Sequence, residues 1–495
     1  MIAGGGPAGM MAGLLLARIG LRVTVLERHP DFLRDFRGDT IHPSTLQLMA
    51  QLGWLEEFLR LPHQKAPDLH AEIAGRQVTI ADFSRLPLDC RYIAFMPQWD
   101  FLNFLAAKAA GLPGFILMMG HRVTALLPGG GVAWESDSGT GEIRAPLVIG
   151  ADGRHSVVRA QAGLEAIDFG SPVDVLWLRL SRLPDDPAPA MSHAGPQQGL
   201  VLIDRGDFWQ CGYVIRKGSF DDMKAAGLPA FREALTALAP LPADRFEEIA
   251  DWDQVHLLSI RMDRLRRWWA PGVLCIGDAA HAMSPVGGFG VNLAIQDAVA
   301  AANILARPLR EGRLRDADLA KVQARRMFPT RATQGLQRMM RRKRNARGEA
   351  APRPPGFVRL IARWPALSRL MGRLIGMGFR PERIRTRAMS QADARPVSNR
   401  LFDLFRLVAV VEGVTTILLF LVAMPVKYAL DNPAWVQVMG PVHGYAFLAY
   451  VALMIAALWG RGWSVTDWLR TFAASLFPFG TFLNEPFLKR RRTRA

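Results

Sequence analysis

Glycines spaced around a short apolar strand are the first group in this chain whose types and spacing could do chemistry. Gly4, Gly6 and Gly9 form a G-x-G-x-x-G pattern between apolar residues 1–3 and an Ala/Leu-rich segment of helical periodicity. Glycines at this spacing let the backbone approach a pyrophosphate at a helix start. A second apolar strand closes on Glu27, whose carboxylate can bind ribose hydroxyls. This order of strand, glycines, helix, strand and acid predicts a dinucleotide site.

A second glycine-rich stretch, residues 277–297, reads GDAAHAMSPVGGFGVNLAIQD and joins a short apolar strand to an apolar helix. Gly287, Gly288 and Gly290 leave the backbone bare where that helix begins. Unpaired N–H groups and the positive end of the helix dipole would therefore face an electron-rich or anionic planar group. Asp278 stands at the end of the strand, where it can accept hydrogen bonds from sugar-like hydroxyls. A tight strand-to-helix turn without a ligand would give the same glycine pattern.

Three further polar residues lie at the expected ends of elements. Arg37 is a candidate for binding an anion or a carbonyl group, or is simply solvated. Gln98 precedes a helix at residues 99–110, so its amide would either meet a cofactor or cap the helix. Asp152 lies in a second glycine turn after a strand at residues 147–149, and this turn could bind a second phosphate.

Short β-rich runs separated by turn residues predict an antiparallel sheet packed on the dinucleotide fold. These runs are residues 174–180, 200–204, 208–215 and 255–262, with further strands expected at 69–80 and 83–90. The floor of this sheet should face the cofactor. Its aromatic candidates for lining a pocket, each of which could equally be plain core, are Trp177, Trp209, Tyr213 and His256.

The charge of the chain has an uneven distribution. Its 495 residues carry a net charge of +17 and give a pI of about 10.7, which is compatible with nucleic-acid binding. However, the basic residues gather at 338–347, 353–387 and 489–494, which flank an apolar C-terminal region. Charges beside apolar spans are attracted to anionic lipid head groups, so we favour a membrane surface and expect no nucleic-acid partner.

The three cysteines, Cys90, Cys211 and Cys275, are far apart and show no metal-ligand spacing. They predict buried, reduced thiols and no metal site. The N-terminus shows no basic region followed by an apolar run and a cleavage site. We therefore expect the globular part in the cytoplasm.

The three motifs, in this order and spacing, resemble the group A flavoprotein monooxygenases, a family similar to para-hydroxybenzoate hydroxylase and the ubiquinone-pathway hydroxylases. The resemblance covers residues 1–387. It implies an α/β fold with a Rossmann-like FAD-binding domain of the glutathione-reductase type and an inserted antiparallel β-sheet substrate domain. It also implies FAD as cofactor, NADPH or NADH as co-substrate, and molecular oxygen, which would react through a flavin C4a-hydroperoxide.

The resemblance assigns roles to particular residues. The N-terminal glycines would hold the pyrophosphate, Asp152 would serve the pyrophosphate and the NAD(P)H path, and Asp278 would bind the ribityl chain. The implied cofactor-binding residues are Gly4, Gly6, Gly9, Glu27, Arg28, Arg37, Gln98, Asp152, Asp278, Gly290, Val291 and Asn292. Backbone roles beside the flavin ring, on the oxygen side, would fall to Pro285, Gly287 and Gly288. The substrate residues would be Tyr213, Trp209 and His256.

Beyond residue 400 the composition becomes strongly apolar. Residues 407–424 and 436–459 are each close to the length that crosses a bilayer, whereas the run at 468–483 is interrupted and would span, re-enter or lie flat. Arginines on both flanks of the first pair place both of its ends in the cytoplasm. Its motifs, including Glu412-Gly413 and His443-Gly444, resemble a small bacterial integral-membrane domain of unknown function.

These observations predict the following domain organisation. The FAD-binding domain comprises residues 1–170 and 263–335 with strands inserted at 69–95, the substrate-binding sheet residues 171–262, a basic linker residues 336–399, and an all-α transmembrane region residues 400–495. The linker contains an amphipathic helix that would either lie in a membrane interface or cap the flavin domain.

The predicted function is hydroxylation of an aromatic or otherwise electron-rich lipophilic substrate by an FAD-dependent enzyme at the cytoplasmic face of a bacterial inner membrane. Two alternatives remain open. One is a flavin-dependent reductase or dehydrogenase of a prenyl or quinone substrate. The other is a flavin-based membrane redox sensor.

Overall fold

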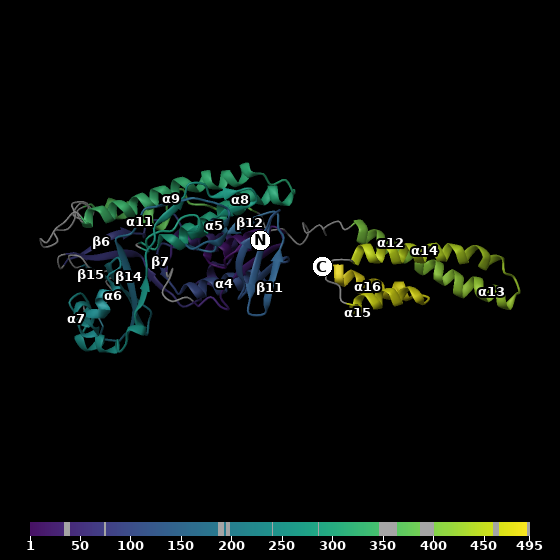
Figure 1. Ribbon diagram of the computed structural model, residues 1–495, viewed down its shortest axis with the longest axis horizontal. Coiled ribbons are helices and arrows are strands. Elements are labelled where there is room, and N and C mark those ends of the chain that lie inside the picture. Colours follow the sequence, from purple (N-terminus) through teal and green to yellow (C-terminus); the bar gives the residue numbers. More distant parts are fainter. Residues whose placement is uncertain are drawn as a thin grey trace. The chain divides into compact units, whose positions relative to one another are not determined.

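The chain forms two compact units, residues Met1–Ala388 and Met389–Ala495 (Figure 1). The computed structural model describes residues 1–33, 40–73, 76–186, 193–194, 199–239, 241–285, 287–345, 364–386, 400–458 and 465–492. The two units are taken in turn below.

A six-stranded sheet organises the first unit, with the order β20-β21-β12-β1-β2-β8. Its strands are β1 Ile2–Ala3, β2 Val23–Glu27, β8 Phe115–Met119, β12 Val148–Gly150, β20 Trp269–Ala270 and β21 Val273–Cys275. All neighbours are parallel except the edge pair β20 and β21. Helices α1 (Pro7–Arg18), α4 (Gln98–Ala110) and α8 (Phe289–Arg310) pack on it through one large apolar core. The predicted α/β class is therefore confirmed.

The second sheet has seven strands in the order β18-β14-β17-β16-β15-β5-β6. Its strands are β5 Asp68–Ile73, β6 Arg76–Asp82, β14 Val173–Ser181, β15 His193–Ala194, β16 Gly199–Asp204, β17 Phe208–Arg216 and β18 His256–Leu258. All pairs are antiparallel except β15 with β5. Helices α6 (Phe220–Ala226) and α7 (Leu228–Thr236) cover one face, together with the 3-10 turns η1 (Ala243–Glu248) and η2 (Trp252–Gln254).

Two predicted strands are wrong in extent. Residues 83–90 form a turn, because the Asp82 carboxylate accepts the Ser84 N–H at 2.9 Å and the Phe83 carbonyl accepts the Leu86 N–H at 3.1 Å. Pro87 then offers no donor to a ladder. The expected strand at 255–262 pairs only over its first residues.

Smaller elements complete the first unit. Two three-stranded sheets have the orders β11-β10-β9 and β3-β7-β4, and β13 pairs with β19. Their strands are β3 Thr40–Ile41, β4 Gln64–Ala66, β7 Ile93–Phe95, β9 Arg122–Leu126, β10 Val132–Ser136, β11 Gly139–Ile143, β13 Ala166–Asp168 and β19 Asp263–Leu265. The remaining helical elements are α2 Pro43–Leu52, α3 Leu55–Phe58, α5 Val157–Gln161, η3 Gly277–Ala279, α9 Asp316–Asn345 and α11 Pro365–Gly376.

Helix α11 covers the first unit, so one of the two predictions for the basic linker is observed. It approaches β6 so closely that a Cβ on Gly372 would lie 1.9 Å from the Asp82 carbonyl oxygen. The residues on its inner face, Ser368, Gly372, Ile375 and Gly376, are buried. Because this inner face packs on the first unit, the opposite, outer face of α11 is exposed.

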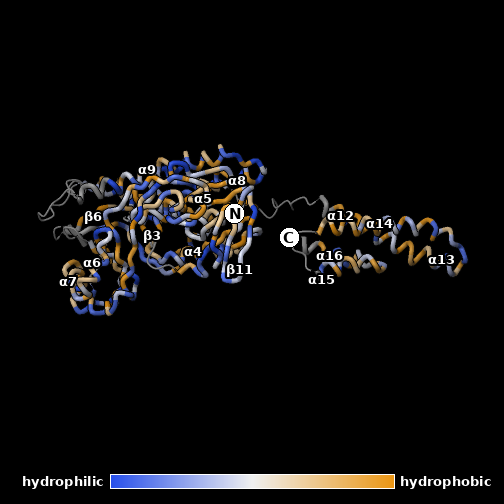
Figure 2. Tube along the Cα trace, in the orientation of Figure 1, coloured by the Kyte–Doolittle hydropathy of each residue, from blue (hydrophilic) through white to orange (hydrophobic). Residues whose placement is uncertain are grey.

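The second unit is entirely helical. Its elements are α12 Arg400–Ile417, the π-helical η4 Leu418–Ala423, α13 Met424–Ala429, α14 Ala434–Leu458, α15 Val465–Ala473, η5 Ala474–Leu476 and α16 Gly480–Arg492. Two stretches, Leu404–Ala429 and Ala434–Leu458, are long and apolar enough to cross a membrane. Figure 2 shows apolar colour along α12 and α14. The third apolar run bends at residues 477–479, where Phe479 has φ 68°, so it forms no single long helix within the described residues.

Helix α8 in the first unit also meets the length and apolarity of a span. Most of its side chains are buried in the core beneath the six-stranded sheet. It is therefore a core helix, and burial rather than composition distinguishes it from the two candidate spans.

Candidate functional site

Two of the three N-terminal glycines are required by close backbone packing, and the third adjoins open space. A Cβ on Gly4, whose φ is +99°, would lie 2.3 Å from the Ala151 carbonyl oxygen, and one on Gly9 would lie 1.9 Å from the Gly4 carbonyl oxygen. These two glycines let β1, β12 and α1 pack together. A Cβ on Gly6 would meet no heavy atom within 4 Å. The start of α1 is therefore open to a ligand, with the N–H groups of its first turn available to an anion.

Two carboxylates stand at the carboxyl ends of β2 and β12, the strands on either side of β1. Glu27 accepts the Gly5 N–H at 2.8 Å and the His29 N–H at 3.1 Å, which fixes it beside the glycine turn. Asp152 accepts the Ser156 hydroxyl at 2.5 Å and the N–H groups of Val157 and Val158 at the start of α5. Burial raises the pKa of Asp152, and these hydrogen bonds act in the opposite direction.

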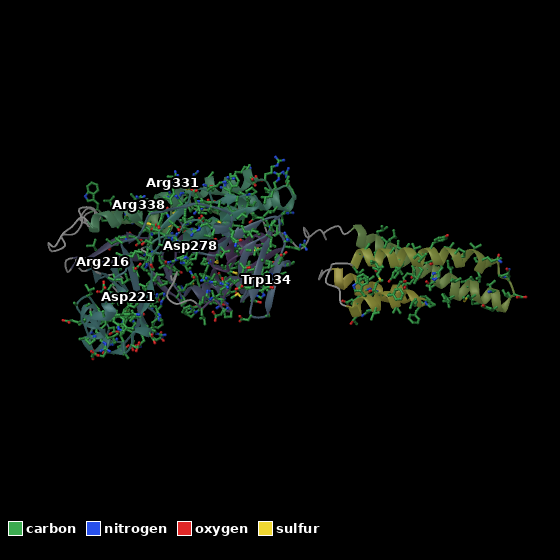
Figure 3. The ribbon with its side chains drawn as sticks, viewed as in Figure 1. Trp134, Arg216, Asp221, Asp278, Arg331 and Arg338 are labelled. Carbon is green, nitrogen blue, oxygen red and sulfur yellow. The ribbon has the colours of Figure 1, made fainter. Side chains whose placement is uncertain are left out.

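A cavity of about 710 Å³ brings several predicted residues together. Arg28, Asp152 and Asp278 all line it, and Figure 3 labels Asp278 within the first unit. The sequence prediction missed the basic wall of the cavity, formed by Arg154, His155, Lys217 and Arg261. Burial lowers the pKa of His155, and the guanidiniums of Arg261, Arg154, Arg159 and Arg28 lower it further. This wall is suited to an anionic ligand.

The loop before α8 is held by one side chain. Asn292 donates from Nδ2 to the carbonyl oxygens of Thr40 at 2.9 Å and Gly288 at 3.0 Å. Its Oδ1 accepts the His42 N–H at 2.9 Å and the Thr45 hydroxyl at 2.8 Å. All four hydrogen-bonding positions of the amide are thus used within the protein. Asn292 therefore positions the predicted flavin loop, and only its backbone remains for a cofactor.

The glycines of this loop also differ in kind. Gly287 and Gly288 have φ of +82° and +63°, a conformation that side chains rarely adopt. A Cβ on Gly288 would lie 2.0 Å from the Thr40 hydroxyl oxygen, whereas one on Gly290 would meet nothing within 4 Å. The space in front of Gly290, like that in front of Gly6, is therefore not filled by the protein itself. The Pro285 carbonyl accepts the Gly288 N–H at 3.0 Å, which closes the turn.

His42 connects this loop to α11. Its Nδ1 lies 2.9 Å from the Ile375 carbonyl oxygen, so the proton is on Nδ1 and Nε2 carries a lone pair. Nε2 is buried without a hydrogen-bond partner among the described residues, and the ring meets Phe289 edge-on at 5.8 Å. Burial lowers the pKa of His42 to about 4. The sequence prediction missed this residue because its partner lies 333 positions further along the chain.

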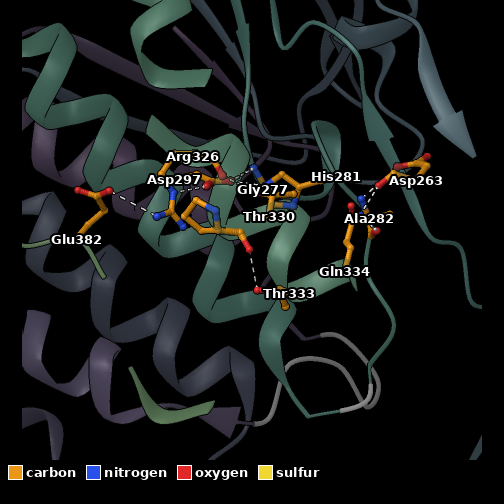
Figure 4. Close-up of polar contacts among 11 residues, drawn as sticks. Asp263, Gly277, His281, Ala282, Asp297, Arg326, Thr330, Thr333, Gln334 and Glu382 are labelled. Carbon is orange, nitrogen blue, oxygen red and sulfur yellow. Dashed lines mark hydrogen bonds and ion pairs between the residues drawn. The ribbon is translucent and has the colours of Figure 1, made fainter. Parts of the chain in front are cut away.

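A buried ionic network braces the turn that carries Asp278 (Figure 4). Oδ2 of Asp297 accepts the Gly277 N–H at 3.1 Å and lies 2.5 Å from Nε2 of His281. Its Oδ1 accepts Nε of Arg326 at 2.8 Å. Burial acts to raise the pKa of Asp297, but His281 and Arg326 more than offset it and hold that pKa below its ordinary value. The network therefore keeps a full charge inside the first unit.

The predicted substrate residues do not meet the loop. Trp209 and Tyr213 lie on the face of β17 that packs against α7, where Trp209 donates to Asp186 at 2.8 Å. His256 is exposed on β18. Trp177, also an aromatic candidate in the sequence, lies on the opposite face of the sheet and packs in the cluster of Phe95, Ile203 and Phe289. The sequence prediction did not single out these three residues. Alternation along β14 separates Trp177 from its neighbours Leu176 and Leu178, and this signal was available in the sequence.

The remaining predicted residues are placed as follows. Gln98 is buried at the first position of α4, and Val291 lies partly buried against the core. Arg37 lies outside the described residues. No group of three or more potential metal ligands is found among the residues that the structure describes.

Comparison with known proteins identifies the family of each part of the chain. An FAD binding domain family matches residues 1–335, and a domain of unknown function, DUF3817, matches residues 402–490. The chain is 33% identical over 405 residues to 6-methylpretetramide 4-monooxygenase of Streptomyces rimosus, which covers 80% of this chain and 96% of that protein. It is 26% identical over 324 residues to para-nitrophenol 4-monooxygenase of Pseudomonas sp. strain WBC-3, with coverage of 63% and 78%.

Solved structures show the same fold. OxyS anhydrotetracycline hydroxylase from Streptomyces rimosus aligns with a TM-score of 0.61 at 24% identity, covering 76% of this chain and 75% of that one. The family match covers the glycine turn at Gly6, the acid at Asp152 and the loop at Gly288. The chain therefore belongs to the family with the FAD binding domain, as an FAD-dependent monooxygenase that carries a C-terminal DUF3817 domain.

Proposed function

We propose that this monooxygenase uses NAD(P)H to hydroxylate a lipophilic aromatic or otherwise electron-rich substrate at the cytoplasmic face of a bacterial inner membrane. The observation that carries the proposal is the apolar cluster at the start of α8, in which Phe95, Ile203 and Phe289 are buried and Trp177 packs against them. The named substrates of the relatives, para-nitrophenol, 6-methylpretetramide and anhydrotetracycline, are aromatic. The two candidate spans give the reason for placing the enzyme at a membrane.

The residues around the loop would perform two tasks in this reaction. When bound, the reduced flavin supplies the activation of molecular oxygen. The first N–H groups of α8 face the space in front of Gly290, and a helix start stabilises negative charge there by about 0.3–1 kcal/mol, and more when partly buried. The apolar side chains of Phe289 and Trp177 would keep water away from this side of the loop, which would protect reactive oxygen species from decay.

The basic wall of the cavity would bind the reductant, because NADH and NADPH both carry an anionic pyrophosphate. Arg154 is the most informative residue to change, since within the described part of the chain its guanidinium hydrogen-bonds to one group, the Ser259 carbonyl oxygen, at 3.0 Å. Arg154→Ala is expected to raise KM for NAD(P)H by about tenfold or more, the effect of losing one charged contact. Steady-state kinetics and FAD titration would show kcat and FAD affinity nearly unchanged. The matched control is Arg216→Ala, an exposed arginine that does not line the cavity.

The proposed function is tested with labelled oxygen. Membranes containing the full chain, washed with alkaline carbonate, are supplied with NAD(P)H, ¹⁸O₂ and lipophilic phenols, beginning with 1-naphthol. We expect the washed membranes to retain the flavin, and one labelled oxygen atom to enter each molecule of product. Loss of the flavin to the wash would count against membrane attachment.

Two other outcomes would favour the alternative functions. NAD(P)H oxidation that is coupled to reduction of an added quinone, with no label in any product, would indicate a reductase or dehydrogenase. Flavin reduction that no phenol or quinone accelerates would indicate a redox sensor. The 33% identity to a named monooxygenase over 405 residues favours the hydroxylase over the sensor.

A further inference from the structure

The outer face of α9 carries a stripe of exposed basic and aromatic side chains. Phe328 is 54% exposed, and Arg331 and Arg338 are exposed on the same side of the helix, three and ten residues further on. Neither arginine forms an ion pair with a carboxylate among the described residues. The guanidiniums of Arg264 and Arg338 both lie over the Phe169 ring, each 5.0 Å from its centroid, and burial together with the charges of Arg331 and Arg338 lowers the pKa of Arg264. This cluster has an uncompensated positive charge.

The outer face of α11 adds apolar side chains beside this stripe. Trp364 and Leu370 are 58% and 51% exposed, and Arg373 is exposed next to them. Leu336 of α9 and Met371 of α11 pack against the same apolar cluster on the inner side of the two helices. Phe328 also meets Phe379, which follows α11, edge-on at 6.3 Å. We define the docking face as the outer faces of α9 and α11.

The opposite end of the first unit has the opposite charge. The segment 220–254, which contains α6, α7, η1 and η2, carries eight acidic and three basic residues, whereas α9 carries two acidic and nine basic residues. Figure 1 shows α9 on one side of this unit and α6 and α7 on the other, and Figure 3 labels Arg331, Arg338 and Asp221 accordingly. An anionic surface would therefore attract one side of the unit and repel the other.

We propose that the docking face lies on the surface of an anionic lipid bilayer. Tryptophan and leucine are suited to the boundary between head groups and acyl chains, and arginine to anionic head groups. The chain itself favours a bilayer as the partner of this face, because it carries a candidate membrane span that begins at Leu404. The segment between residue 386 and this span measures about 60 Å when fully extended, which limits how far the first unit can lie from a bilayer that the span crosses. The basic sequence between α9 and α11, residues 346–363, has four arginines and one acidic residue and fits the same partner. The inference does not depend on the reaction that the enzyme performs.

The test measures the depth of single spin labels on the full chain in lipid nanodiscs. Leu370→Cys places a label on the docking face, and Asp221→Cys places one on the acidic end as the matched control. The native thiols Cys90, Cys211 and Cys275 are buried and should not compete for the label. Discs of neutral phosphatidylcholine are compared with discs that contain 30% phosphatidylglycerol. The measurements are collision rates with a water-soluble nickel chelate and with lipid-soluble oxygen.

In anionic discs we expect the rate at which the label at 370 collides with the nickel chelate to fall about fivefold or more, and its collision rate with oxygen to rise. The reason is that each basic residue near an anionic surface strengthens binding to that surface by about this factor. The label at 221 should not respond to lipid composition. Adding Arg331→Glu should restore nickel access at 370, whereas Lys224→Glu, the same charge change on the acidic end, should not. Equal nickel access at 370 and 221 in anionic discs would overturn the proposal. Protection at 370 that persists in neutral lipid and in Arg331→Glu would also overturn it, in favour of burial by a protein surface.

Discussion

Replacement of Asp297 with alanine is expected to destabilise the flavin-binding unit by about 3–5 kcal/mol, the cost of breaking a buried ion pair by removing one partner. The substitution would leave the Arg326 guanidinium buried, with only the longer contact to Glu382 at 3.5 Å remaining. It would also remove the acceptor of the Gly277 N–H, which orients the turn bearing Asp278. The variant should therefore lose FAD as well as stability.

Urea unfolding of the full chain, followed by flavin fluorescence, measures both effects. Asp297→Asn keeps the size and one acceptor and should fall between the wild type and the alanine variant. Asp316→Ala removes an exposed carboxylate at the start of α9 and serves as the matched control, with an expected change within about 0.5 kcal/mol. A loss of less than 1 kcal/mol in Asp297→Ala would show that the network contributes little.

The Asp297 carboxylate also makes the stability of the folded chain depend on pH on the acid side. Because the pKa of Asp297 is lower in the folded chain than in the unfolded chain, its contribution is present above the ordinary aspartate pKa of about 3.9 and is lost as pH falls through the folded value. The pH dependence of unfolding should thus be weaker in Asp297→Ala than in the wild type on the acid side.

Gly288→Ala and Gly290→Ala are expected to distinguish a glycine that the loop needs for its own conformation from a glycine that leaves room for the ligand. A side chain at Gly288 meets both the left-handed conformation, about 1–2 kcal/mol, and a clash with Thr40, so we expect a loss of about 2–4 kcal/mol of stability. FAD affinity should fall by about two orders of magnitude as the loop moves.

Gly290→Ala should act differently, because its methyl group enters open space and the residue is helical. Without FAD its unfolding free energy should stay the same or rise by up to about 1 kcal/mol, the usual gain of alanine over glycine in a helix. FAD affinity should nevertheless fall, because the methyl group takes space from the flavin. Isothermal titration with FAD and unfolding of the apoprotein give both quantities. Equal FAD affinity in Gly290→Ala and the wild type would place the flavin elsewhere.

Local patterns in the sequence predict the cofactor domain well. The glycine turn at Gly4 to Gly9, the acids at Glu27 and Asp152, and the glycine loop at Gly288 each belong to one strand, one turn and one helix start. Their mechanisms need only neighbouring residues. For this reason the sequence predicts the α/β fold and the family without tertiary information.

The sequence predicts the substrate side poorly, and the reasons are physical. Trp209 and Tyr213 are residue types that often line pockets, but strand alternation places their side chains in the core under α7. Trp177 lies on the other face of the sheet, against the cluster that contains Phe289. That error was avoidable. The role of His42 was not foreseeable, because it depends on a carbonyl of α11 that only the folded chain brings near.

Helix α8 has a consequence for how the chain is made. A segment of this length and apolarity is a potential substrate for the membrane-insertion machinery, as are the two stretches in the second unit. Asp297 stands near its middle, and an aspartate at the centre of a helix opposes insertion by about 2.5–3.5 kcal/mol. The carboxylate that holds the Gly277 turn in the finished enzyme would therefore also oppose the insertion of α8 into lipid during synthesis.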